Sequence, residues 1–345
     1  MRKIKMLALI CLFTTFAGMM YQLIGEEHLD YNSILFGISL GLGFGLLELY
    51  LFPRVENWFR QWPFTKMLVF KALLYTAVIF IVSLSLNVII GLNEGRKMID
   101  LLTLIVSRSF LVLILYTLVI YSLLVFLLQI NYLLGEGILW KFLRGKYHKP
   151  REEERIFMFL DMKSSTTIAE QLGHVRFYAL LNELFNEITQ PVLHTKAEIY
   201  QYIGDEVVLT WKVDQGLQNS NCLKTFFMFQ ESLFLNSEKY LKNYGVKPEF
   251  KAGLHFGKVI SAQIGDLKRE IVYNGDVLNT ASRIQNECNR YDRNCLVSGL
   301  LRDRLKQMNG FQWERMDAVT LRGMETETEL FSVVDPNASY FSARA

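Results

Sequence analysis

The sequence predicts a chain of two parts, an α-helical membrane domain of four transmembrane helices and an α+β domain on the cytoplasmic side. Hydrophobic residues make up 51% of its 345 residues, more than a soluble domain of ordinary composition carries. Most of this excess lies before residue 135, and the segment after Pro150 mixes charged, polar and apolar residues. The expected boundaries are 1–130 for the membrane domain, 131–154 for a helical linker, 155–334 for the α+β domain and 335–345 for a flexible tail.

Four apolar segments are each long enough to cross a bilayer, which takes about 20 residues in a helix. They occupy residues 6–24, 33–52, 67–92 and 101–130. The first segment could instead belong to a cleaved secretory signal, but no small-x-small cleavage site follows it, so we count it as a span. An even number of spans returns both ends of the chain to one side of the membrane.

Basic residues on one set of loops predict the orientation of the spans. Cytoplasmic loops are enriched in Lys and Arg, and the enriched positions lie before the first span, between the second and third, and after the fourth: Arg2, Lys3, Lys5, Arg54, Arg60, Lys66, Lys141, Arg144 and Lys146. We therefore expect a multi-pass protein of the cell (inner) membrane with both termini and the α+β domain in the cytoplasm. Membrane lipid is then a partner, and the signal or ligand that the spans receive stays unknown.

Three glycines recur at every fourth residue of the second predicted span, at Gly37, Gly41 and Gly45. This spacing places them on one helix face, where small residues let another helix approach closely. The approaching helix belongs either to the same bundle or to a second copy of the chain.

Charged residues also lie within the predicted spans. A charge in a bilayer is costly unless it finds a partner or reaches the headgroups. We expect Lys71 to pair with Glu48 or to reach the headgroups, and we consider Arg108 a candidate for a buried contact with a ligand or signal.

Composition excludes two classes of protein. The formal net charge is only +3, and the basic residues form no stripe with interleaved aromatics, which argues against nucleic acid as a partner. The four cysteines lack both C-x-x-C spacing and the density of a disulfide scaffold, as expected of a chain in a reducing cytoplasm.

The linker has the apolar spacing of a helix. Such a helix either transmits a shift or rotation to the α+β domain or serves as a passive tether.

The first segment with a candidate functional residue is the apolar run IFMFLD, which ends in Asp161. Such a run predicts a buried strand. Ser164, Ser165 and Thr166 follow at the turn into what we expect to be one long amphipathic helix, with its apolar side at Ile168, Leu172, Val175, Leu180, Leu184 and Ile188. Backbone N–H groups at a strand-to-helix turn favour anions, so this turn is a candidate phosphate-binding site.

The second such segment, IYQYIGDEVVLTW, predicts two paired strands joined by a tight turn at Gly204 and Asp205. If this hairpin lies beside the first strand, Asp161 and Asp205 converge over the anion-binding turn. Two carboxylates beside phosphate oxygens make the oxygen-rich environment that Mg²⁺ or Mn²⁺ takes. Either aspartate alone would more often be a turn cap or a solvated residue.

Four segments resemble class III adenylate and guanylate cyclases of the bacterial membrane-bound form, and they occur in family order. FLDMKSST is similar to the family's first metal-binding loop, YIGDEVVLTW to its second metal hairpin, GLHFGKVISAQIG to its central strand pair and GDVLNTASRIQ to its transition-state helix. The resemblance covers about residues 155–334 and implies a ferredoxin-like fold. A diguanylate cyclase is a weaker alternative, because IGDEV is only partly like a GGDEF hairpin.

The resemblance implies that the ribose 3′ hydroxyl of a nucleoside triphosphate attacks its own α-phosphorus and that pyrophosphate leaves. It implies two Mg²⁺ or Mn²⁺ ions per site, held by Asp161, Asp205 and the backbone carbonyl of Met162. Asn279 would orient the ribose, and Arg283, one helical turn later, would meet the charge that develops at the phosphorus. Family architecture draws these two sets of residues from different catalytic domains, which implies a homodimer with two equivalent sites.

Base selection in the family depends on two positions that are occupied here by Gln201 and Val272. Glutamine offers a donor and an acceptor, whereas valine offers only shape, so discrimination by hydrogen bonding is weakened. The expected activity is an adenylate cyclase, a phosphorus-oxygen lyase that converts ATP to 3′,5′-cyclic AMP in intracellular signalling. A guanylate cyclase and a degenerate nucleotide-binding or dimerisation module of a membrane receptor are the alternatives. Arg322 is a further candidate contact to the triphosphate.

Overall fold

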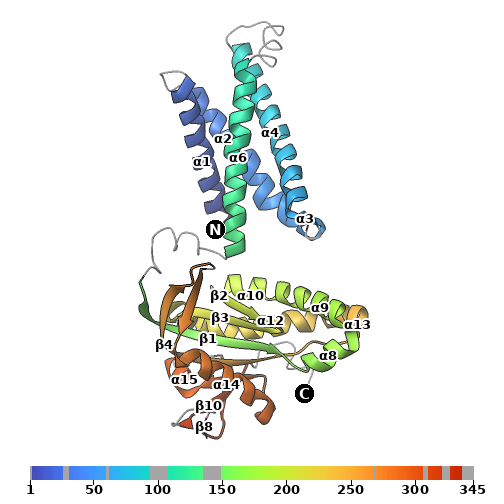
Figure 1. Cartoon of the computed structure of the whole chain (residues 1–345), viewed down its shortest axis with the longest axis vertical. Coiled ribbons are helices and arrows are strands. Elements are labelled where there is room, and N and C mark those ends of the chain that lie inside the picture. The colour runs from blue at the N-terminus through green and yellow to red at the C-terminus, as the bar shows by residue number, and fades with distance from the viewer. Residues whose placement is uncertain are drawn as a thin grey trace. The chain divides into compact units, whose positions relative to one another are not determined.

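The structure is a computed structural model that describes residues 2–25, 31–59, 62–93, 108–134, 149–267, 269–305, 310–320 and 327–335. Contacts divide the chain into two compact units, Met1–Leu134 and Gly135–Ala345 (Figure 1). Most of the linker expected over 131–154 lies outside the described residues; 131–134 end a helix and 151–154 begin a strand. Residues 336–345 of the expected tail also lie outside them.

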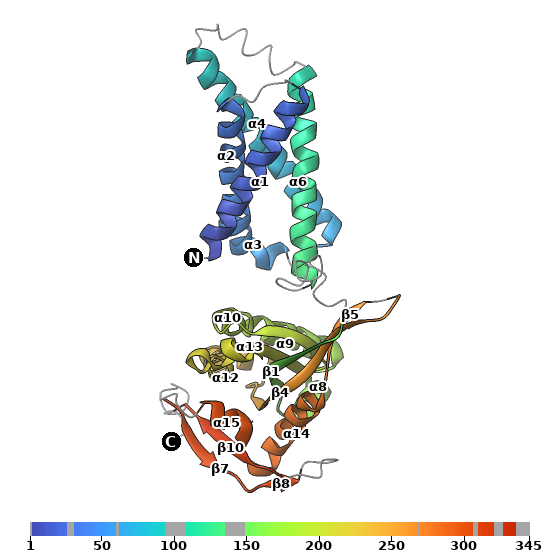
Figure 2. The same ribbon diagram turned by 90° about the vertical axis from the view of Figure 1, so that its left-hand side faces the viewer.

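The described part of the first unit is helical. Its elements are α1 (Arg2–Gly25), α2 (Tyr31–Leu46), a π-helical turn η1 (Leu47–Leu51), α3 (Phe52–Phe59), α4 (Phe64–Asn93) and α6 (Arg108–Leu134). Figures 1 and 2 show α1, α2, α4 and α6 running lengthwise beside one another within this unit.

Three of the four predicted spans correspond to helical stretches that are long and apolar enough to cross a membrane: Met6–Leu23, Ile34–Val55 and Thr65–Leu86. In the described part of the fourth, α6 carries a shorter apolar stretch, Ile114–Leu127. The beginning of that predicted span, 101–107, lies outside the described residues. The count of four spans and the orientation of the unit therefore stay predictions.

The glycine face of α2 packs against α1 of the same chain. A Cβ atom added at Gly37 would lie 2.4 Å from the Thr15 Cα, and one at Gly41 would lie 2.6 Å from the Cys11 Cα. The Thr14 hydroxyl donates to the Gly37 carbonyl at 2.7 Å, which the close approach permits. Packing inside one bundle is therefore confirmed as the use of this face.

Charged residues in the first unit behave in two different ways. The Lys71 ammonium lies 3.0 Å from a carboxylate oxygen of Glu48, and the Tyr75 hydroxyl donates to the same oxygen, so the predicted pairing is confirmed. Arg108 is the first residue of α6 and its side chain is exposed. Residues 101–107 lie outside the described part of the chain, and the contact of Arg108 with a ligand or signal stays a prediction.

The second unit is built on a mixed sheet. In its described residues eight strands pair in the order β2-β3-β1-β4-β6-β10-β7, and β5 pairs with the far end of β4. The pair β4–β6 is parallel and the other pairs are antiparallel. The strands are β1 (Arg151–Met162), β2 (Glu198–Ile203), β3 (Glu206–Lys212), β4 (Phe250–Ile264), β5 (Glu270–Asn274), β6 (Cys295–Ser298), β7 (Gln312–Arg315) and β10 (Leu330–Val334); β8 (Val319–Thr320) and β9 (Glu327–Thr328) pair separately.

Helices cover both faces of this sheet (Figure 1). One face carries α8 (Ser165–Leu172), α9 (His174–Glu187), α10 (Thr189–His194), α12 (Asn221–Leu235), α13 (Ser237–Tyr244) and α15 (Gly299–Leu305), whose buried leucines share one core with α9 and α12. The other face carries α14 (Asp276–Tyr291). The short helix α11 (Val213–Leu217) and the 3₁₀ turn η2 (Gln218–Ser220) connect β3 to α12. The order β1, helices, β2, β3, helices, β4 is the β-α-β-β-α-β connection of a ferredoxin-like fold. The predicted α+β fold is therefore confirmed for this unit.

The apolar run of β1 is buried because both of its faces are covered. Side chains alternate along a strand, and Phe157 and Phe159 share a core with Val277 and Ala281 of α14. The intervening residues pack into the larger core beneath the other helices: Ile156, Met158 and Leu160. By the same alternation Asp161 lies on the α14 side.

The single long helix expected after Asp161 is wrong. Gly173 has φ +73° and separates α8 from α9, because this left-handed conformation ends a helix and suits a residue without Cβ. The break rotates the following residues, and Val175, expected on the apolar side, is 85% exposed.

Candidate active site

The two predicted metal ligands lie at neighbouring strand ends. Asp161 is the next-to-last residue of β1 and pairs in register with Glu206 of β3. Asp205 directly precedes Glu206, in the two-residue turn of the β2–β3 hairpin, where Gly204 has φ +62°. A positive φ at the first turn residue is typical of tight hairpins. The chain therefore brings Asp161 and Asp205 together as the spacing predicts.

Three carboxylates crowd this corner of the sheet. Burial and the charge of Asp205 raise the pKa of Asp161, and the ammonium of Lys251 offsets part of that rise. Burial and the charges of Asp161 and Asp205 raise the pKa of Glu206 to about 7. The folded protein thus disfavours the ionised forms of Asp161 and Glu206, and a cation placed beside them would relieve the repulsion.

Asp161 is held by two side chains that the sequence reasoning missed. The Gln285 amide of α14 donates to Asp161 Oδ2 at 2.9 Å, and the Lys251 ammonium of β4 lies 3.3 Å from the same oxygen. Lys251 also donates to Asn289 Oδ1 at 3.2 Å. Lys251 and Gln285 are only 6% and 2% exposed. A lysine inside the apolar run of β4 was the signal that could have revealed this partner.

The carboxylate pair fits a divalent cation that shares its ligands with a substrate. Within the described ranges no group of three or more His, Cys, Asp and Glu side chains is arranged to hold a metal ion by itself. Mg²⁺ commonly takes one or two carboxylates and completes its shell with water and substrate phosphates. Met162 ends β1 next to Asp161, with its side chain buried on the opposite face, so its carbonyl stays a candidate ligand.

The turn after β1 is strained. Ser164 has φ +55°, a left-handed conformation that costs a residue other than glycine about 1–3 kcal/mol. Helix α8 begins at Ser165 without a side-chain cap, so the N–H groups of its first turn lack intrahelical partners. Ser164 and Thr166 are exposed and Ser165 is half-buried. This arrangement suits the phosphate-binding role expected of the three residues.

The predicted transition-state pair lies on a different face of α14 from Gln285. Asn279 and Arg283 are separated by about 40° around the helix, and Gln285 lies about 160° from Arg283. The buried side of α14 consists of Val277, Thr280, Ala281, Ile284, Gln285 and Cys288. Asn279 is exposed and Arg283 is half-buried. The pair thus points away from Asp161, and the structure does not bring these residues together within one chain.

The two base-selecting positions lie beside two tyrosines that touch. Gln201 is exposed on β2 and follows Tyr200, whereas Val272 is half-buried on β5 and precedes Tyr273. The rings of Tyr200 and Tyr273 have centroids 5.1 Å apart, and the Tyr273 backbone N–H donates to the Tyr200 hydroxyl at 3.4 Å. Arg322 lies outside the described residues.

Comparisons with known proteins agree with this architecture. Residues 147–334 match the family described as the adenylate and guanylate cyclase catalytic domain. A solved structure of a bacterial light-regulated adenylyl cyclase superposes with a TM-score of 0.53 at 19% identity, covering 64% of this chain and 65% of that one. At this identity, the superposition on the solved structure supports the fold alone.

Two relatives from Rhizobium meliloti (strain 1021) each match about half of the chain. Adenylate cyclase 2 is 36% identical over 182 residues, and adenylate cyclase 1 is 26% identical over 188 residues; each alignment covers 53% of this chain. The alignments span 50% and 28% of those relatives' own lengths. The family match covers more than half of this chain, and the chain belongs to the class III adenylate and guanylate cyclase family.

Proposed function

We propose that the chain is a membrane-anchored adenylate cyclase that converts ATP to 3′,5′-cyclic AMP and pyrophosphate, at sites shared between two copies. The observation that carries this proposal is the orientation of α14. Its buried side supplies Gln285 to Asp161, while Asn279, which is exposed, and Arg283, which is half-buried, lie outside that buried side. An asparagine and an arginine placed in this way can meet an aspartate pair only on another copy.

In this proposal each site takes Asp161 and Asp205 from one copy and Asn279 and Arg283 from its partner. A two-fold symmetric dimer presents the same surfaces twice, so it contains two equivalent sites. An interface of this kind would also cover Asn279, which is exposed in a single chain. A monomer would hold each half-site without the other.

Asp161 and Asp205, with the Met162 carbonyl, would hold two divalent cations such as Mg²⁺ or Mn²⁺. When bound, these cations supply charge neutralisation for the triphosphate and activation of the attacking ribose oxygen. Lys251 and Gln285 keep Asp161 in place before substrate arrives, because both contact one of its oxygens. The uncapped first turn of α8, from Ser164 to Thr166, would bind phosphate oxygens through backbone N–H groups.

The partner's α14 would complete the reaction. The Arg283 guanidinium would stabilise the negative charge that develops on the transferred phosphoryl group, and the Asn279 amide would hold the ribose so that its 3′ oxygen faces the phosphorus. Contacts of this kind strengthen in the transition state and so raise kcat more than they lower KM. Gln201 and Val272 would line the base.

The first unit would anchor the catalytic unit to the inner membrane by four helices, with both termini and the catalytic unit in the cytoplasm. Three stretches with the length and apolar composition of a span support this anchor, and the distribution of basic residues supports its orientation. Signalling through cyclic nucleotide production would follow from a catalytic unit that is attached in this way.

Complementation tests the shared site. Asp161→Ala and Arg283→Ala chains are each expected to be inactive, because each change removes a residue from both sites of a homodimer. Mixed dimers, purified through two different tags, would contain one intact site and should recover about half of the wild-type rate. Purified mixed dimers that show no activity would contradict the shared site.

A matched control uses two changes on the same half-site. Dimers of Asp161→Ala with Asp205→Ala chains lack an intact aspartate pair at either site, so they should stay inactive. Assay of the wild-type chain with Mn²⁺ and either ATP or GTP decides the substrate. Cyclic GMP as the main product would make the chain a guanylate cyclase, and no product from either nucleotide would favour a degenerate binding module.

A further inference from the structure

A fully buried arginine lies in β1, away from the metal corner. The Arg155 side chain is 0% exposed. It lies six residues before Asp161 on the same strand face, which places it about 20 Å away along the strand. Replacing a buried ion pair by apolar residues is often neutral or stabilising, so stability alone does not account for a charge at this position.

The guanidinium of Arg155 contacts its own strand and two others, β2 and β5, which are not neighbours in the sheet. Its Nη1 lies 3.3 Å from Glu198 Oε2 of β2, and its Nε lies 3.2 Å from Glu153 Oε1 of β1. Its face covers the ring of Tyr273 on β5, with Cζ 4.6 Å from the ring centroid. Nη2 is buried without a hydrogen-bond partner in the described structure, so the guanidinium is held by these three contacts.

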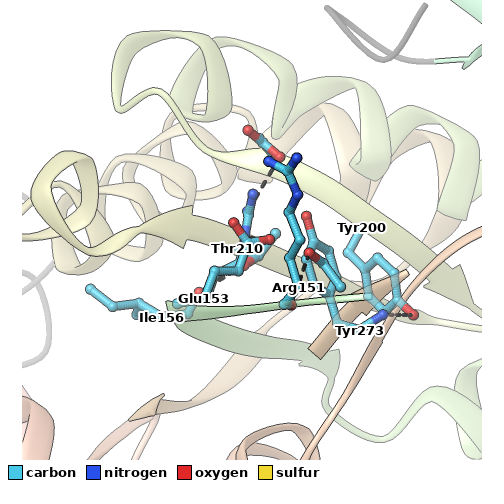
Figure 3. A network of polar contacts seen from close by, with 9 residues as sticks. Arg151, Glu153, Ile156, Tyr200, Thr210 and Tyr273 are labelled. Atoms are coloured by element: carbon cyan, nitrogen blue, oxygen red, sulfur yellow. Dashed lines mark hydrogen bonds and ion pairs between the residues drawn. The ribbon is translucent and has the colours of Figure 1, made fainter. Parts of the chain in front are cut away.

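The contacts of Arg155 end next to the base-selecting positions. Glu198 precedes Gln201 by three residues in β2, and Tyr273 directly follows Val272 in β5. The rings of Phe157, Tyr200 and Tyr273 pack together, with centroids 5.1 to 6.3 Å apart. Figure 3 shows Tyr200 and Tyr273 beside one another, joined by the hydrogen bond from the Tyr273 backbone N–H to the Tyr200 hydroxyl.

We propose that Arg155 is a positioning residue for base recognition, since one guanidinium holds together β2, which carries Gln201, and β5, which carries Val272. This inference rests on the proposed cyclase function. An exposed glutamine and a valine have few contacts of their own to fix their separation, and a cation–π contact combined with a charged pair resists sliding of the two strands. Arg155 thus acts on the base through Glu198 and Tyr273 and touches no reacting atom.

The test compares a ligand that has a base with one that does not. Arg155→Met keeps the volume and apolar contacts of the side chain but removes the charge. In the full-length chain it should raise KM for ATP by about fivefold or more while kcat changes by less than about twofold. The inhibition constant of inorganic tripolyphosphate, which carries no base, should stay within about twofold of the wild type.

Two further variants make the test decisive. Glu198→Gln removes one anchor of the guanidinium at a partly exposed position, so it tests the same idea if Arg155→Met fails to fold, and it should raise KM for ATP in the same direction. Lys258→Met is the matched control, because Lys258 of β4 pairs with Glu152 of β1 on the surface and joins neither β2 nor β5, so this change should leave both constants unchanged.

The outcomes separate the two proposals. A wild-type chain that forms no cyclic nucleotide would refute the proposed function. If the wild type is active, an unchanged KM in the folded Arg155→Met chain, or in Glu198→Gln if only that variant folds, overturns the role of Arg155. A parallel rise of KM and the tripolyphosphate constant overturns it as well, because general damage to the site affects both ligands.

Discussion

Gln285 offers a direct test of the proposed metal site at Asp161. Its buried amide donates to Asp161 Oδ2 at 2.9 Å. A hydrogen bond to a charged group contributes about 1.5–3 kcal/mol, which corresponds to roughly 10–100-fold in an equilibrium constant. Loss of an outer partner of a metal ligand typically costs about the same factor in metal affinity. Gln285→Leu should therefore weaken Mn²⁺ binding by about 10–100-fold.

The measurement is Mn²⁺ titration of the detergent-solubilised full-length chain, with free Mn²⁺ followed by electron paramagnetic resonance. Cyclase activity of Gln285→Leu should rise again when Mn²⁺ is increased by about the same factor. Asn286→Leu is the control, because Asn286 lies one residue further along α14, is exposed, and bonds locally to the Ser282 carbonyl at 3.1 Å. A folded Gln285→Leu chain that binds Mn²⁺ as the wild type does would refute the reasoning.

Two further predictions concern β4. Burial lowers the pKa of His255 from 6.5 to about 4, so its contribution to stability is present above pH 6.5 and is lost as the pH falls through 4, by up to about 3 kcal/mol. The free energy of unfolding of the wild type and of His255→Gln should be measured at several pH values. The difference between the two free energies should shrink by this amount towards pH 4, and a constant difference would contradict the prediction. Gly253→Ala would place Cβ 2.2 Å from the Gln285 backbone nitrogen and 2.5 Å from the Ala281 carbonyl oxygen, so α14 must shift. Both the melting temperature and the cyclase rate should therefore fall. An unchanged cyclase rate would show that the position of α14 does not matter for activity.

Local patterns in the sequence were sufficient for much of this fold. The apolar run before Asp161 became a buried strand because both faces of β1 are covered, and the glycine–aspartate pair became a two-residue hairpin turn. The glycine spacing of α2 became a close contact with α1, since small residues permit that approach. These features depend on residues near one another in the chain, which is what periodicity and turn chemistry report.

Other features depended on contacts between distant segments. The helix expected after Asp161 breaks at Gly173 and leaves Val175 exposed, because the path of the chain around the sheet decides which residues are covered. Lys251 and Gln285 reach Asp161 from elements that are 90 and 124 residues further along the chain. Neither shows as a partner in a motif, because each is an ordinary polar residue until the fold brings it to the carboxylate.

The sequence by itself determined the two-part chain and the aspartates at strand ends, because each is a local pattern, and its resemblance to the cyclases singled out Asn279 and Arg283. Only the tertiary structure decided that Asn279 and Arg283 face away from Asp161. The direction of a helix side is set by which residues pack on the sheet, and on α14 these are Val277, Thr280, Ala281, Ile284, Gln285 and Cys288. That packing turns Asn279 and Arg283 away from the sheet and gives Asp161 a lysine and a glutamine as neighbours.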